Sequence, residues 1–64
     1  MQRHFVETRR CDDGFTYEVW QRLNIYGEPV YFPAALNTDG KGALLGGCLA
    51  KTPDDVHKAM TLKR

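Results

Sequence analysis

The 64-residue sequence predicts one small α+β domain, an antiparallel meander of three to four strands with one C-terminal helix packed on one face. Three observations support this fold class. Residues 15–23 alternate between apolar and polar side chains, as a half-buried strand does. The preceding Asp12-Asp13-Gly14 is a strong hairpin signal. Near the C-terminus, Thr52 opens a helix-capping pattern.

The first predicted strand spans residues 3–11 and forms a hairpin with residues 15–23. A two-residue Asp13-Gly14 loop would pair Arg9 with Glu18, whereas a three-residue loop would shift every pair and turn the first strand over. We favour the two-residue loop because it places opposite charges side by side. In that register one face carries Glu7, Arg9, Glu18, Trp20 and Arg22, and the other carries His4, Val6, Thr8, Phe15, Tyr17 and Val19.

The third strand is expected at residues 30–32, with residues 34–36 as an extension. Pro33 has no amide hydrogen, which makes this strand an edge or ends it early. Residues 37–42 contain two glycines and no apolar anchor, so we expect a loop. Residues 43–50 are apolar with two adjacent glycines in the middle. A helix would lose roughly 1 kcal/mol at each glycine, so this segment is expected to be a buried, kinked strand.

The C-terminal helix is expected to begin at Pro53, with Thr52 as its N-cap and Asp55 completing a capping box. The acidic residues of the first turn suit the positive end of the helix dipole. Its apolar face consists of Val56, Ala59, Met60 and Leu62. The expected platform for this face is Phe15, Tyr17 and Val19. His57 and Lys58 are expected to point away from the sheet.

Composition excludes several functions. The net charge of +1 gives no general attraction to nucleic acid or to an anionic membrane. No apolar run approaches the ~20 residues of a membrane span, and the N-terminal residues lack a signal-peptide pattern, so we expect a cytoplasmic protein with no membrane partner. The sequence contains no serine and no phosphate-binding loop, and we expect neither catalysis nor a cofactor.

The two cysteines, Cys11 and Cys48, are expected to be ordinary half-buried thiols. A disulfide between them is an alternative that requires Cα atoms within ~7 Å. A metal site that adds His4 and His57 is a further alternative, but no two of these residues have the spacing typical of metal ligands. We therefore expect no bound metal.

Residues 47–59 run from a glycine through Thr52-Pro53-Asp54-Asp55 into the expected helix. With the order of elements over residues 6–62, this segment resembles the three-stranded sheet and helix of plant AP2 domains and of the N-terminal arms of tyrosine integrases. In that family the exposed sheet face places Arg and Trp side chains in the DNA major groove. The resemblance implies a DNA-binding set of Arg3, Arg9, Arg10, Trp20, Arg22 and Lys41.

The hypothesis that we favour is a non-enzymatic module that binds another protein through its sheet face or through residues 37–42. Trp20 is either covered or exposed; if exposed, it is an anchor of the kind that dominates protein interfaces. The candidate partner-binding residues are Trp20, Arg22, Arg9, Tyr26 and Tyr31. A domain of this size suits a small accessory or inhibitor protein of phages and mobile elements, anti-CRISPR inhibitors among them. DNA is the alternative partner, and a homodimer through the edge strand at residues 30–36 is another.

Overall fold

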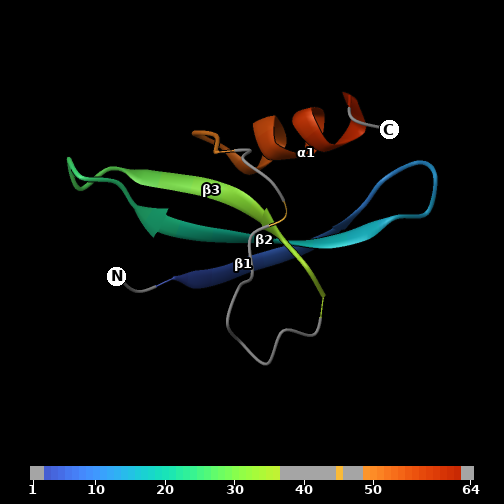
Figure 1. Cartoon of the computed structure of the whole chain (residues 1–64), viewed down its shortest axis with the longest axis horizontal. Helices are drawn as coiled ribbons and strands as arrows, with labels where there is room; N and C mark the ends of the chain where they lie inside the picture. Colours follow the sequence, from blue (N-terminus) through green and yellow to red (C-terminus); the bar gives the residue numbers. More distant parts are fainter. Residues whose placement is uncertain (1–2, 37–44, 46–48, 63–64) are drawn as a thin grey trace.

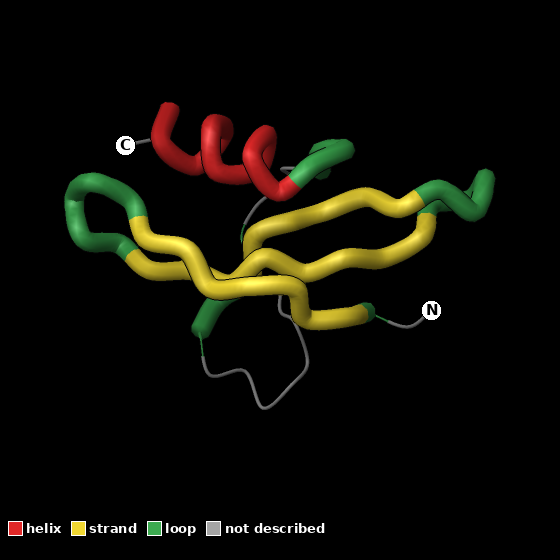
Figure 2. The backbone as a smooth tube through the Cα atoms, turned by 180° about the vertical axis from the view of Figure 1, so that it is seen from behind, coloured by secondary structure: helices red, strands yellow, loops and turns green. Residues whose placement is uncertain are grey.

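The computed structural model describes residues 3–36, 45 and 49–62. Three strands, β1 (His4–Arg10), β2 (Thr16–Leu23) and β3 (Pro29–Ala34), form an antiparallel sheet in the order β1-β2-β3. The helix α1 (Pro53–Leu62) lies across one face of this sheet (Figure 1), and the view from behind shows the same two layers (Figure 2). The predicted α+β meander with a C-terminal helix is therefore confirmed, with three strands.

The hairpin between β1 and β2 has a three-residue loop, so the two-residue register that the charges favoured is wrong. The Cys11 N–H donates to the Phe15 carbonyl at 2.7 Å, and the Gly14 N–H donates to the Cys11 carbonyl at 2.9 Å. Gly14 has a φ of +90°, the geometry of a type I turn followed by a glycine bulge. Such a loop needs positive φ at glycine alone, whereas the two-residue type I′ loop also needs it at Asp13.

This register turns β1 over relative to the prediction. Arg9 lies opposite Tyr17 and Glu7 lies opposite Val19. Since Tyr17 and Val19 are buried against the helix, Glu7 and Arg9 also lie on the helix side of the sheet. The expectation that Arg9 shares a face with Trp20 is therefore wrong.

A bulge in β1 then reverses the alternation of its side chains. The register shifts between Phe5 and Glu7, with Val6 as the additional residue. Phe5 consequently lies opposite Trp20, on the face away from the helix. The two rings meet edge-on, with centroids 6.0 Å apart. One strand thus contributes charged residues to one face and an aromatic ring to the other.

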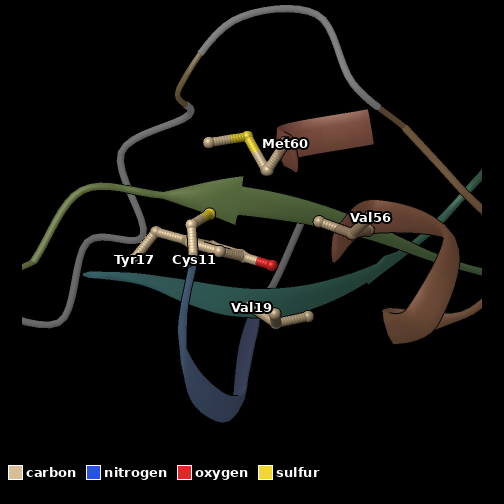
Figure 3. Packing of buried hydrophobic residues seen from close by; sticks show 5 residues of the cluster. All are labelled: Cys11, Tyr17, Val19, Val56 and Met60. Carbon is tan, nitrogen blue, oxygen red and sulfur yellow. The ribbon is translucent and has the colours of Figure 1, made fainter. Parts of the chain in front are cut away.

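Apolar clusters lie on both faces of the sheet. The cluster under the helix consists of Cys11, Tyr17, Val19, Val56 and Met60 (Figure 3). It includes the predicted contact of the β2 platform with the apolar face of α1, which is confirmed. The cluster on the opposite face, which we call the far-face cluster, consists of Trp20, Phe32 and Ala34, whose exposed fractions are 7%, 1% and 0%. Trp20 is therefore covered, the first of the two alternatives that the sequence left open.

The outer edge of β3 pairs with described residues of the apolar 43–50 segment. Tyr31 exchanges two backbone hydrogen bonds with Ala50, at 2.7 and 2.9 Å, and the Leu45 N–H donates to the Pro33 carbonyl at 2.9 Å. Because backbone groups alternate along a strand, the nitrogen of Pro33 also points to this side, away from β2. The predicted edge position of Pro33 is confirmed, and β3 continues past it. Leu49 belongs to no strand and is 50% exposed, so the expectation of a buried strand is wrong at this residue. Residues 43–44 and 46–48 of the expected fourth strand lie outside the described residues.

The start of α1 follows the capping pattern. The Thr52 hydroxyl accepts a hydrogen bond from the Asp55 N–H at 3.1 Å, as an N-cap residue does. Val56 and Met60 are buried, and Ala59 is half-buried. Leu62 is 79% exposed, so it does not belong to the apolar face. The helix is thus fixed to the sheet by its first two turns.

The left-handed backbone at Gly14 gives a prediction about stability. Gly14→Ala should lower the free energy of unfolding by about 1–2 kcal/mol, because an L-residue is strained at that φ. The added methyl would meet only an ordinary contact, 3.7 Å from Arg10, so the cost is conformational. Urea denaturation measures it, with Asp12→Ala in the same turn as the control. Equal unfolding midpoints for the two variants would contradict the turn assignment.

Trp20→Ala should destabilise the domain by about 3–5 kcal/mol, because it empties the centre of the far-face cluster. A 64-residue domain has a total stability of only about 3–10 kcal/mol, so cooperative thermal melting should weaken or disappear. Tyr26→Ala is the control, since Tyr26 is 79% exposed. Differential scanning calorimetry measures both; a Trp20→Ala domain that melts like the wild type would show that the indole is not a core residue.

Candidate functional site

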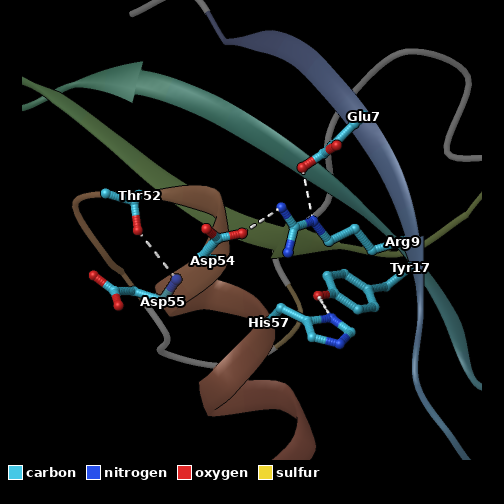
Figure 4. A network of polar contacts seen from close by, with 7 residues as sticks. All are labelled: Glu7, Arg9, Tyr17, Thr52, Asp54, Asp55 and His57. Atoms are coloured by element: carbon cyan, nitrogen blue, oxygen red, sulfur yellow. Dashed lines mark hydrogen bonds and ion pairs between the residues drawn. The ribbon is translucent and has the colours of Figure 1, made fainter.

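A polar network joins β1 to the first turn of α1 (Figure 4). Arg9 Nε donates to Glu7 Oε2 at 2.7 Å, and Arg9 Nη2 donates to Asp54 Oδ1 at 2.8 Å. These hydrogen bonds raise the pKa of Arg9, with the larger contribution from Asp54. Both carboxylates are substantially exposed, so the ion pairs add little stability. Their effect is to hold Arg9 on the helix side, where it cannot contribute to a binding surface around Trp20.

Tyr17 and His57 form the second part of this network. The Tyr17 hydroxyl lies 2.7 Å from His57 Nδ1, and the two rings are stacked with centroids 6.0 Å apart. The expectation that His57 points away from the sheet is therefore wrong. Burial raises the pKa of Tyr17 to about 12, the Cys11 thiol adds to the rise and Arg9 opposes it. A buried hydroxyl that keeps its proton at neutral pH is a structural contact between helix and sheet.

The raised pKa of Tyr17 predicts a loss of stability at alkaline pH. An unfolded tyrosine ionises near pH 10, whereas Tyr17 in the folded chain ionises near pH 12. The contribution of the buried neutral hydroxyl is complete below pH 10 and is lost as the pH rises from 10 to 12, amounting to about 3 kcal/mol.

Urea denaturation at several pH values, with Tyr17→Phe as the reference, measures this contribution. Phenylalanine keeps the buried ring and removes the ionisable group. The stability of the wild type relative to Tyr17→Phe should therefore be constant up to pH 10 and then fall by about 3 kcal/mol as the pH rises to 12. A difference that stays constant to pH 12 would contradict the assignment.

The turn between β2 and β3 is built like the turn between β1 and β2. Gly27 has a φ of +77°, and its N–H donates to the Asn24 carbonyl at 3.0 Å. The Asn24 N–H donates to the Glu28 carbonyl at 2.8 Å. Asn24 Oδ1 also accepts hydrogen bonds from the N–H groups of Tyr26 and Glu28, at 2.8 and 2.9 Å. These bonds define the conformation of the whole loop.

The two turns carry opposite residue types at their central positions. Asp12 and Asp13 occupy these positions in the first turn, as turn preferences require. Ile25 and Tyr26 occupy them in the second turn, where they are 85% and 79% exposed. Leu23, at the end of β2, is 49% exposed. We call Leu23, Ile25 and Tyr26 the apolar tip; nothing in the turn itself requires apolar side chains there.

Two cavities lie at the same end of the sheet as the apolar tip. One, of about 280 Å³, is lined by Asn24, Glu28, Pro29, Val30 and Lys51. The other, of about 90 Å³, is lined by Arg3, Arg22, Phe32 and Leu49. The β2–β3 turn and the N-terminal end of β1 lie at this end of the molecule in both overall views (Figures 1 and 2). The candidate functional site is thus one end of the sheet.

The structure separates the residues that the sequence proposed for partner binding. Trp20 is buried, and its indole Nε1 donates to Glu18 at 2.9 Å. Tyr31 is half-buried, and its hydroxyl accepts a hydrogen bond from Gln21 at 3.0 Å. Of the five candidates, Tyr26 belongs to the apolar tip and Arg22 lines a cavity beside it. The proposed patch of Trp20 with Arg9 does not form.

The residues of the DNA-binding set are also dispersed. Arg3 and Arg22 line one cavity, but Arg9 lies on the other face and is paired with two carboxylates. Arg10 lies at the opposite end of β1, near Gly14. Lys41 and the rest of residues 37–42, the other predicted binding segment, lie outside the described residues.

Sequence reasoning missed the importance of Ile25 and Leu23. The signal was the spacing Asn24-x-x-Gly27, which repeats the spacing Cys11-x-x-Gly14 of the first hairpin. Two apolar residues between an asparagine and a glycine at that spacing are placed at an exposed turn. The same comparison would have indicated the three-residue loop in both hairpins.

Among the described residues, no group of three or more His, Cys, Asp or Glu side chains is arranged to hold a metal ion. Cys11 is a buried free thiol, and Cys48 lies outside the described residues. No helix in residues 3–36 and 49–62 has the length and apolar character to cross a membrane.

Comparisons with known proteins give no relative. The chain matches no protein-family model, no curated protein and no solved structure. The resemblance to AP2 domains and integrase arms therefore stays a prediction from element order.

Proposed function

We propose that this protein is a non-enzymatic binding module that engages another protein through its apolar tip. The observation that carries the proposal is the pair Ile25 and Tyr26, which are 85% and 79% exposed at the centre of a turn held by hydrogen bonds. Exposing two large apolar side chains in this way costs solubility and adds nothing to the fold. Contact with a partner explains their presence.

The conformation of the tip supports this function. Asn24 and Gly27 fix the backbone on both sides of the exposed pair. A partner would therefore bind a preformed surface and would lose little conformational entropy in ordering it. Tyrosine is among the residues that most often dominate the energy of an interface, because its ring gives a large contact area and its hydroxyl a polar contact.

A protein partner is favoured over DNA by the arrangement of charge. Binding to duplex DNA requires a series of cationic contacts along the phosphate backbone. Here Arg9 is neutralised by Glu7 and Asp54, and the apolar tip stands out from the end of the sheet. The proposed role is that of a small accessory or inhibitor protein, and the phage and mobile-element inhibitors of bacterial defence are the class in which we place it.

The decisive variant replaces the tip pair with the residues that the other turn carries. Ile25→Asp/Tyr26→Asp should leave the melting temperature unchanged or raise it, because the turn geometry accepts aspartate. Affinity for a partner isolated by crosslinking and capture from the source cell should fall at least tenfold, as expected when an aromatic anchor is lost. Isothermal titration calorimetry with the purified partner measures this change.

The matched control is Asp12→Asn/Asp13→Asn, which alters the equivalent positions of the first turn. It should keep both the fold and the affinity. Equal partner affinity for the wild type and for Ile25→Asp/Tyr26→Asp would overturn the proposal. A light-scattering mass of two chains that becomes one chain in the same variant would identify the partner as a second copy.

A further inference from the structure

We propose that the cavity between Arg3 and Arg22 is an oxyanion site that receives a carboxylate side chain of the partner protein. This inference rests on the proposed function and names the chemistry of its partner. The observation behind it is that two arginines, Arg3 and Arg22, line one cavity together with the buried Phe32.

The cavity is built from different parts of the chain. Its volume of about 90 Å³ is well above the ~10–15 Å³ that a cavity needs to hold one water molecule. The Arg3 guanidinium carbon lies 5.3 Å from the centroid of the Phe32 ring, which is within cation–π range. Phe32 is 1% exposed, so the ring that holds Arg3 is itself fixed in the far-face cluster.

Arg22 lacks a protein counter-ion in the described part of the chain, where both ion pairs belong to Arg9. It is half-buried and shares its cavity with a second cation. An anion bound in this cavity supplies Arg22 with the counter-ion that the described residues do not provide. Guanidinium groups bind carboxylates through two parallel N–H···O hydrogen bonds, a geometry that a lysine cannot reproduce.

The site is adjacent to the apolar tip. Arg22 lies opposite Val30 in the last but one pair of β2 and β3, and Leu23, opposite Pro29, forms the last pair before the turn. The neighbouring groove contributes Lys51 and one anion, Glu28. The end of the sheet therefore combines apolar contact with an excess of positive charge, which complements an acidic partner surface.

A carboxylate is favoured over the phosphates of a nucleic acid because the site holds one group. On this face Glu18 bonds to Trp20, and its negative charge interrupts any path of cations from Arg22 towards Arg10. A nucleic acid strand needs several successive phosphate contacts. A single Asp or Glu side chain needs only the arginine pair.

The direct test uses small probes and the whole chain. The arginine Nε–Hε signals are followed by ¹H–¹⁵N NMR during titration with N-acetyl-glutamate N-methylamide, which carries one carboxylate, and separately with inorganic phosphate and a 12-nucleotide single-stranded DNA. We expect saturable shifts of the Arg3 and Arg22 signals with the glutamate probe and no saturable shift of Arg10. In Arg22→Gln the affinity should fall about tenfold.

Arg10→Gln is the matched control, because it removes the same charge at the far end of the sheet and should keep wild-type affinity. Arg22→Lys retains the charge and should bind more weakly than the wild type, since the two-bond geometry is lost. Equal shifts at Arg10 and Arg22, or equal affinity in Arg22→Gln and Arg10→Gln, would overturn the site. Saturable binding of DNA or phosphate without binding of the glutamate probe would overturn the assignment of the ligand.

Failure of this inference can be told apart from failure of the proposed function. The titration needs no partner, and Ile25→Asp/Tyr26→Asp should bind the glutamate probe as the wild type does. Loss of partner binding in the tip variant together with unchanged partner affinity in Arg22→Gln would reject the carboxylate site and retain the tip. Partner binding that weakens with Arg22→Gln and falls with added salt supports both.

Discussion

The left-handed backbone of Gly14 determines what each face of the sheet carries. Because one glycine supplies the positive φ, the first loop has three residues. The pairing of β1 with β2 is therefore shifted by one residue relative to that of a two-residue hairpin. That shift places Arg9 beneath the helix, where Asp54 can reach it. It also requires the bulge at Val6, without which Phe5 would lie on the same side as Arg9 and leave Trp20 uncovered.

The elements of the fold followed from local sequence, and their relation to one another did not. The alternation of residues 15–23 and the cap at Thr52 are short-range signals, and each identified its element correctly. Asp12-Asp13-Gly14 is compatible with two loop lengths, and a charge pair between Arg9 and Glu18 is worth less than the strain of a second positive φ. The residues of β1 do not predict the bulge, because the bulge depends on the packing of Phe5 against Trp20 of β2.

The site was harder to predict for a physical reason. A single tryptophan on a polar strand face suggests an anchor only if nothing covers it, and its burial depends on Phe5 and Phe32, which are distant in sequence. Tyr26 was identified as a candidate, but its neighbour Ile25 has meaning only once the turn is known. Helix α1 was located from its cap, yet the contact of His57 with Tyr17 depended on the strand register as well.

The two turns have the same loop length and the same positive-φ glycine position, and in both the glycine that sets the backbone differs from the two central residues whose side chains are exposed to solvent. Gly14 and Gly27 set the backbone of the two turns. The two residues at the centre of each turn can be acidic, as Asp12 and Asp13 are, or apolar, as Ile25 and Tyr26 are. Under the proposed function, mutation at Ile25 and Tyr26 would change what the protein binds and leave the backbone of the turn as it is. For the inhibitor role that we propose, such a chain would follow a target that evolves to escape binding by exchanging two side chains.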